Sequence, residues 1–175
     1  MATRKQARQK SLLQILALLI AVVILLVGGV LLQNWWNNRP GPQPQEVSIT
    51  ATVGDASLEI SPYLVCEPGV DCPEGEVPNL AVGPDDTLVL DIPEAIYDHD
   101  WQVLMIYDDP AANDQQLHAA NDAQQVEIPG STDPIGENTE RPRLMVVEVS
   151  SVMLGHNDAG EETPYTTVWS LSTMS

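Results

Sequence analysis

The chain has 175 residues, with 25 acidic and 7 basic side chains and a formal net charge of −18. All the acidic residues lie from Glu46 onward, where Arg141 and Arg143 are the only cations, so this part carries 2 − 25 = −23. Such a surface repels phosphate backbones, which excludes nucleic-acid binding. It attracts basic proteins and cations, although dispersed acids also simply keep an exported domain soluble.

The stretch from Leu12 to Leu32 contains a single polar side chain, Gln14, and no charge. A helix of this length covers about 31 Å, which matches the hydrocarbon thickness of a bilayer. The sequence therefore predicts a transmembrane α-helix over residues 12–36, in which Trp35 and Trp36 lie at headgroup depth.

The basic segment 1–11 precedes this span and contains no acid. The positive-inside bias places it in the cytoplasm and residues 46–175 outside the cell membrane. A cleaved signal peptide is the alternative, but the apolar run is long and no small-x-small site follows it, which favours an uncleaved single-pass anchor.

Four small residues lie near one face of the predicted helix: Ala17, Ala21, Gly28 and Gly29. Small residues let a second helix approach closely, so this face could pack against other membrane proteins. Such residues also occur in membrane helices that pack against nothing, and both readings stay open.

Residues 37–45 include RPGPQPQ, which predicts a stiff, extended linker. Beyond it, short alternating runs separated by turn residues predict strands and no amphipathic helix. The pattern is typical of an all-β fold, an antiparallel immunoglobulin-like β-sandwich, with Trp101 and Trp169 as core anchors. The expected strands cover residues 46–53, 56–61, 87–92, 101–107, 117–120, 124–128, 143–154 and 165–173. The Gly54-Asp55 pair between the first two predicts a β-hairpin.

Cys66 and Cys72 are the only cysteines, and both lie on the predicted exported side. A structural disulfide is therefore expected. The Cys-x5-Cys spacing suits neither a zinc site nor a thioredoxin-like redox site.

The densest ionisable cluster is Asp98-His99-Asp100, a weak candidate for a divalent metal. Adjacent residues of an extended chain point to opposite sides, so the three side chains do not easily converge. No nucleophile elbow, phosphate loop, dinucleotide fingerprint or zinc-protease motif occurs. We therefore expect no bound metal, no cofactor and no enzyme activity.

These features together resemble an actinobacterial family of single-span envelope proteins known only as a domain of unknown function. The resemblance is carried by the N-terminal span, the cysteine pair after the first hairpin, and the motifs Pro93-Glu94-Ala95-Ile96, Trp101-Gln102-Val103 and Trp169-Ser170-Leu171. It supplies no catalytic residues. Some small proteins of this kind look like accessory subunits of larger membrane assemblies, and the resemblance implies that role as one option.

The sequence thus predicts a non-enzymatic, membrane-anchored extracytoplasmic interaction module, with an accessory subunit of a respiratory or envelope complex as one form. The first alternative is an extracytoplasmic binder of a divalent cation or a cell-wall glycan through loops at one end of the sandwich. The second alternative is a hydrolase whose site carries no recognisable motif.

Overall fold

The computed structural model describes residues 4–37, 41–136, 139–157 and 159–174, with the backbone alone described for 4–16, 36 and 37. The chain divides into two compact units, Met1–Pro40 and Gly41–Ser175. Each unit is treated separately below, and the second is called the two-sheet domain.

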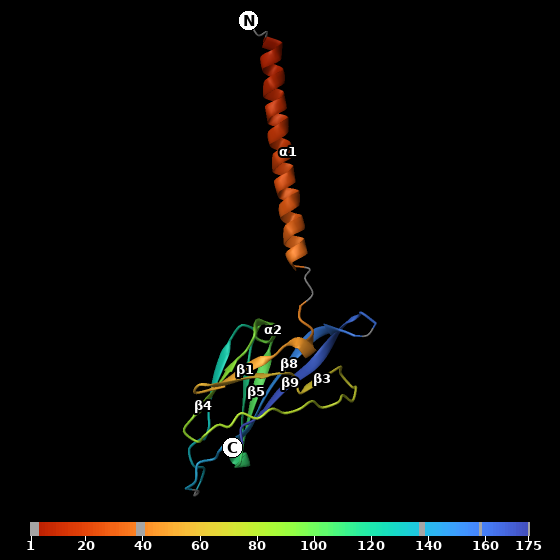
Figure 1. Ribbon diagram of the computed structural model, residues 1–175. Helices are drawn as coiled ribbons and strands as arrows, with labels where there is room; N and C mark the ends of the chain where they lie inside the picture. Colours follow the sequence, from red (N-terminus) through yellow and green to blue (C-terminus); the bar gives the residue numbers. More distant parts are fainter. Residues whose placement is uncertain (1–3, 38–40, 137–138, 158, 175) are drawn as a thin grey trace. The chain divides into compact units, whose positions relative to one another are not determined.

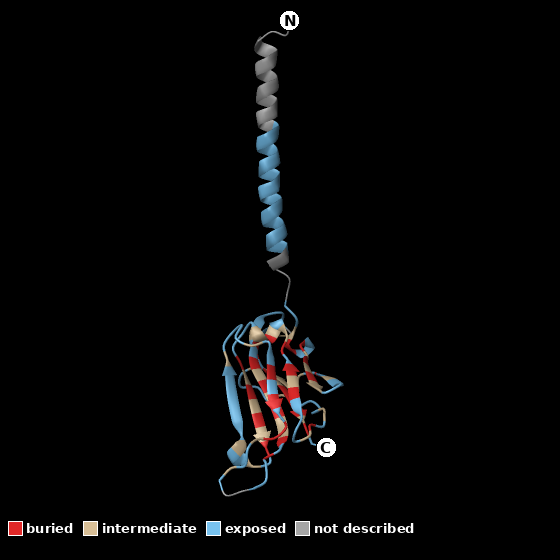
Figure 2. Ribbon diagram, turned by 90° about the vertical axis from the view of Figure 1, so that its left-hand side faces the viewer, coloured by how far each residue is buried: buried red, intermediate tan, exposed pale blue. Residues whose placement is uncertain are grey.

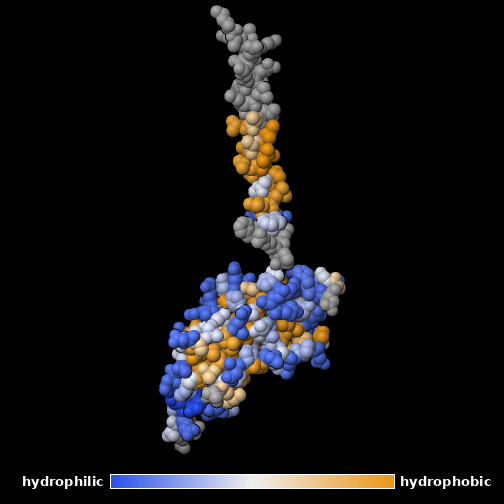
Figure 3. All heavy atoms as spheres, viewed as in Figure 1, coloured by the Kyte–Doolittle hydropathy of each residue, from blue (hydrophilic) through white to orange (hydrophobic). Residues whose placement is uncertain are grey.

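The first unit is the helix α1 (Arg4–Asn37). It begins eight residues before the predicted span, so part of the basic segment is also helical. Within it, Ala17–Trp35 is long and apolar enough to cross a membrane, and none of that stretch is buried in the structure. Figure 3 shows hydrophobic residues around most of the part of this helix that it colours. The chain therefore has one N-terminal helix that could anchor in a membrane.

The second unit is built from short strands and three short helical turns (Figure 1). In chain order these elements are η1 (Pro44–Glu46), β1 (Ile49–Val53), β2 (Ala56–Ile60), β3 (Leu64–Cys66), β4 (Thr87–Asp91), α2 (Glu94–Tyr97), β5 (Trp101–Tyr107), η2 (Pro110–Ala112), β6 (Asp114–His118), β7 (Gln125–Pro129), β8 (Leu144–His156) and β9 (Glu162–Ser172).

The strands form two sheets, of order β2-β1-β4-β7 and β3-β9-β8-β5-β6. All pairings between these strands are antiparallel. The β8–β9 ladder is the longest, extending from Val146 opposite Ser172 to His156 opposite Glu162. It forms the centre of the five-stranded sheet, with β3 on one side and β5 and β6 on the other.

Buried residues from both sheets form one hydrophobic core. The core is mainly aliphatic, because the chain contains no Phe. Trp169 is fully buried, and its indole N–H donates a hydrogen bond to the carbonyl of Val47 at 2.7 Å. This bond connects β9 of one sheet to the segment that leads into β1 of the other. Figure 2 shows buried and more exposed residues alternating along the strands.

These observations confirm a predominantly β domain of two antiparallel sheets after one apolar helix. The immunoglobulin-like assignment goes beyond them and stays a prediction. The β1–β2 hairpin lies where the Gly54-Asp55 pair predicted it, with Gly54 at φ +56°. Trp101 and Trp169 are both buried, as expected of core anchors.

Three details differ from the predicted elements. The strand expected at 117–120 lies at Asp114–His118. A four-residue helix, α2, follows Pro93, whose fixed φ suits a helix start. The two-sheet domain begins at Gly41, so the second half of the predicted linker belongs to the domain.

Candidate interaction surface

The outward face of the four-stranded sheet is mainly polar. Its core-facing residues, such as Ala51, Leu88 and Ile128, alternate with outward side chains. The outward positions hold Thr50, Thr52, Ser57, Glu59, Val89, Asp91, Gln125 and Glu127. A polar outer face is what a sheet with one solvated side requires.

The outward face of the five-stranded sheet is different, because exposed apolar side chains lie on it among polar ones such as Gln102, Glu148 and Ser150. Leu117 is 76% exposed, and Val152 and Leu154 are each 57% exposed. Neighbouring half-buried residues extend this group across three strands. We define the apolar face as Leu104, Ile106, Leu117, Val146, Val152, Leu154 and Val168.

A short row of polar side chains crosses the apolar face. The amide of Gln115 donates to Gln102 at 2.6 Å, and the amide of Gln102 donates to the hydroxyl of Ser150 at 2.9 Å. This row joins β6, β5 and β8 on their outward side. Its members partly satisfy one another, so an apolar partner could cover them at a low desolvation cost.

A hollow of about 610 Å³ lies on this face where β5 begins and β6 ends. We call it the β5–β8 hollow. It is lined by Asp100, which precedes β5, and by residues of β5, β6, β8 and β9 that include Gln102, Leu117, His118, Ser150 and Val152. Concave sites with apolar walls and a few polar groups are the usual form of a binding site.

Two of the residues that line the hollow stack on each other: the imidazole of His118 lies on the indole of Trp101, with ring centroids 4.2 Å apart. Trp101 is 3% exposed, and its Nε1 has no hydrogen-bond partner among the described residues. The Nε2 of His118 is also buried, and none of the residues that the structure describes forms a hydrogen bond with it. The pair forms a flat aromatic support under the end of the sheet.

The predicted metal candidates do not converge. The Nδ1 of His99 lies against the Asp98 carboxylate, while the Oδ1 of Asp100 accepts the backbone N–H of Ala120 at 3.0 Å. Across the described ranges, no three His, Cys, Asp or Glu side chains are grouped closely enough to hold a metal ion. Asp100 instead lines the β5–β8 hollow.

The two cysteines form a disulfide, with their Cα atoms 5.7 Å apart. It closes a short loop that follows β3, an edge strand of the five-stranded sheet. The disulfide indicates an oxidising, extracytoplasmic location for the two-sheet domain. Nearby, the pKa of Tyr63 is raised, mainly because its hydroxyl donates a hydrogen bond to the carboxylate of Glu74.

The predicted helix-packing residues lie in the exposed middle of α1. Ala17 and Ala21 are exposed, and a side-chain carbon added at Gly28 or Gly29 would meet nothing within 4 Å. There is room for a second helix beside them, so lateral packing stays a prediction.

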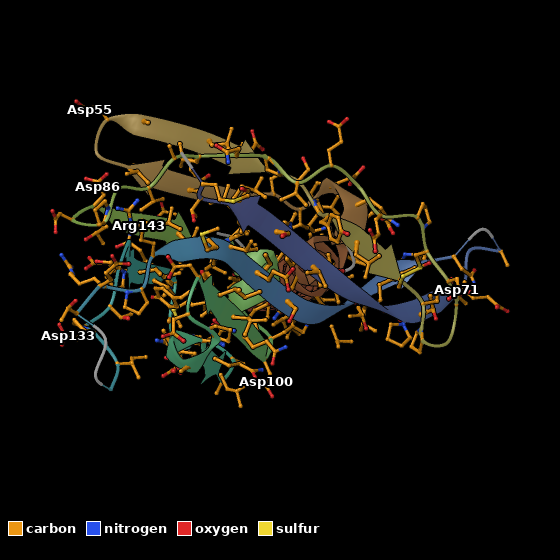
Figure 4. The ribbon with its side chains drawn as sticks, turned by 90° about the horizontal axis from the view of Figure 1, so that it is seen from below. Asp55, Asp71, Asp86, Asp100, Asp133 and Arg143 are labelled. Atoms are coloured by element: carbon orange, nitrogen blue, oxygen red, sulfur yellow. A yellow bond between two sulfur atoms is a disulfide. The ribbon has the colours of Figure 1, made fainter. Side chains whose placement is uncertain are left out.

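The two arginines of the domain lie together at a different place. Arg141 donates to the carboxylate of Asp85 at 2.6 Å, and both Arg141 and Arg143 line an open hollow of about 1140 Å³ beside Asp108. Figure 4 shows Arg143 well separated from Asp100. The basic side chains therefore do not neutralise the β5–β8 hollow.

The segment before β1 is fixed to the β8–β9 hairpin. The side-chain carbonyl of Gln43 accepts the backbone N–H of His156 at 3.0 Å, and Pro44 is buried. A side-chain carbon at Gly155 would lie 2.8 Å from Pro44. Gln43 and Pro44 are thus held against the β8–β9 hairpin.

A family model described as protein of unknown function (DUF2771) matches residues 42–174, which is nearly the whole two-sheet domain. The chain belongs to this family. Similar proteins include the uncharacterized protein Rv0875c of Mycobacterium tuberculosis H37Rv and the uncharacterized protein Mb0899c of Mycobacterium bovis. Each is 26% identical over 155 residues, which cover 85% of this chain and 91% of the relative. No solved structure matches.

These matches confirm the resemblance to an actinobacterial family of unknown function. The family supplies no site residues, so the candidate site stands on geometry alone. Sequence reasoning missed the apolar face. The available signal was the run from Arg143 to Leu154, in which apolar residues occupy both alternating sets of positions in parts of the strand.

Proposed function

We propose that the protein is a non-enzymatic, membrane-anchored interaction module whose two-sheet domain docks through the apolar face onto an extracytoplasmic domain of another membrane protein. The observation that carries this proposal is the contrast between the two outward faces: one is mainly polar, whereas the other exposes Leu117, Val152 and Leu154. An exposed apolar group on one side of a domain is typical of a protein–protein interaction site.

The charge of the domain favours one class of partner. With −23 formal charges from residue 46 onward, two copies of this domain repel each other. A partner with an apolar centre and a basic rim would instead be attracted. Such charge complementarity increases the association rate and disfavours acidic partners.

The apolar helix is the reason to expect a partner that also lies in the membrane. We propose that residues 12–36 span the bilayer, with residues 1–11 in the cytoplasm because their cations outnumber those beyond the span. Only three residues, 38–40, separate α1 from the two-sheet domain. Confinement near the membrane raises the effective concentration of the domain for neighbouring membrane proteins. An accessory role in a larger respiratory or envelope complex is one form of this function.

The alternative functions have weaker support. Trp101 and Trp169 are buried, so neither offers an open ring face to a glycan. For a divalent cation, the described residues supply no group of three ligands. Neither the glycan binder nor the hydrolase is favoured by a specific observation.

Purification of the tagged chain from its own membranes in a mild detergent tests the proposal. We expect a co-purifying membrane protein that is lost with Val152→Asn and Leu154→Asn. The matched controls are Val70→Asn and Val77→Asn, which alter exposed valines outside the apolar face and should retain the partner. Recovery of the same proteins with all four variants, or of the chain alone at every salt concentration, would contradict the proposal.

A further inference from the structure

The β5–β8 hollow combines apolar side chains, Leu117 and Val152, with a floor of paired polar groups and the carboxylate of Asp100. We infer that it receives a lysine or arginine side chain of the docked partner, with the methylene stem between Leu117 and Val152 and the cationic group at Asp100. This inference rests on the proposed function, and it names the chemistry of the contact at the centre of the interface.

The walls and floor suit an aliphatic stem. Leu117 comes from β6 and Val152 from β8, and both are mostly exposed. Between these strands, Gln102 of β5 lies directly opposite both Leu117 and Ser150. Because the Gln102 amide already bonds to the Ser150 hydroxyl, methylene groups can cover this floor without breaking a hydrogen bond. Lysine and arginine commonly lay their stems along apolar surfaces in this way.

The charged residue at the hollow selects a cation. Asp100 uses its Oδ1 to accept the N–H of Ala120, which orients the carboxylate and leaves Oδ2 for a second bond. A charge-assisted bond to this oxygen would be stronger than a neutral one. Figure 4 shows Asp100 at the periphery of the domain, where a partner can reach it.

Other side chains fit less well. A carboxylate would be repelled by Asp100 and by the acidic surroundings of Asp98 and Asp122. A purely apolar side chain could fill the hollow, but it would remove water from Asp100 without replacing the hydrogen bonds that water makes there. The hollow therefore fits a side chain that is apolar along its length and positive at its end.

Methyl NMR of the full chain in nanodiscs tests this inference with three peptides of equal length. The probes are acetyl-Val-Lys-Val-Lys-Val-amide and its analogues with norleucine or Glu in place of Lys. We expect the lysine peptide to shift the methyl signals of Leu117 and Val152 and to bind at least tenfold more tightly than the norleucine peptide. The glutamate peptide should leave both signals unchanged.

Two variants test whether the preference for the lysine peptide depends on the carboxylate of Asp100. Asp100→Asn keeps an oxygen that can accept the Ala120 N–H, so the fold should persist while the preference for lysine disappears. Glu127→Gln removes one carboxylate from the outward face of the four-stranded sheet and should leave the preference intact. Equal binding of the lysine and norleucine peptides, or equal effects of the two variants, would overturn the inference. That result would leave the proposed function standing if Val152→Asn and Leu154→Asn still release the partner.

Discussion

The two tryptophans of the domain should respond differently to the same substitution. Both are buried in the core, and phenylalanine in place of either removes a similar volume. The indole of Trp169 donates to the buried carbonyl of Val47, whereas Nε1 of Trp101 has no partner among the described residues. The comparison of Trp169→Phe with Trp101→Phe therefore isolates one hydrogen bond between the sheets.

The magnitude follows from the cost of leaving a buried acceptor without its donor. Without the indole N–H of Trp169, the buried Val47 carbonyl has lost its hydrogen-bond donor. Leaving a buried acceptor unpaired costs about 1–3 kcal/mol. Trp101→Phe removes an unpartnered N–H and keeps a ring that can stack on His118. We expect Trp169→Phe to be the less stable variant by about 1–3 kcal/mol.

Urea unfolding of the full chain in detergent, followed by circular dichroism, measures this difference as a shift in midpoint. Equal slopes for the two variants would show that the same surface unfolds in each. Equal midpoints, or a lower midpoint for Trp101→Phe, would refute the assignment of the hydrogen bond.

Three further outcomes follow from the structure. Replacement of both Cys66 and Cys72 by Ser should lower the free energy of unfolding by only about 2 kcal/mol, because the closed loop is short, and native circular dichroism should persist. Gly155→Ala should displace Pro44 and cost about 1–3 kcal/mol, which limited proteolysis would detect as faster cleavage near the start of the domain. Burial raises the pKa of Tyr107, with Asp114 adding to the effect. The unfolded chain then loses this proton first as the pH rises above about 10, so stability should fall there, and less steeply for Tyr107→Phe in pH-dependent urea titrations.

The sequence predicted elements that depend on local patterns. The apolar run predicted the helix, the Gly54-Asp55 pair predicted the first hairpin, and alternation predicted most strands. The strand at Asp114–His118 was predicted at 117–120 instead, because it is a polar edge strand whose side chains are almost all exposed. Such a strand has no burial pattern for the sequence to reveal.

The candidate site could not be predicted, because it depends on which strands pair. Leu117, Gln102 and Ser150 are neighbours only because β6, β5 and β8 lie side by side in a particular register. A register slip of one residue would move each of these side chains to the other face. Asp100 was singled out as a weak metal candidate, and its place beside the hollow emerged only from the folded chain.

Site-specific photocrosslinking in intact cells tests the central claim most directly. Benzoylphenylalanine would replace Val152 on the apolar face or Val89 on the outward face of the four-stranded sheet. Docking through the apolar face predicts a covalent adduct with another membrane protein from position 152 and none from position 89. Adducts with the same protein from both positions, or from neither, would contradict it.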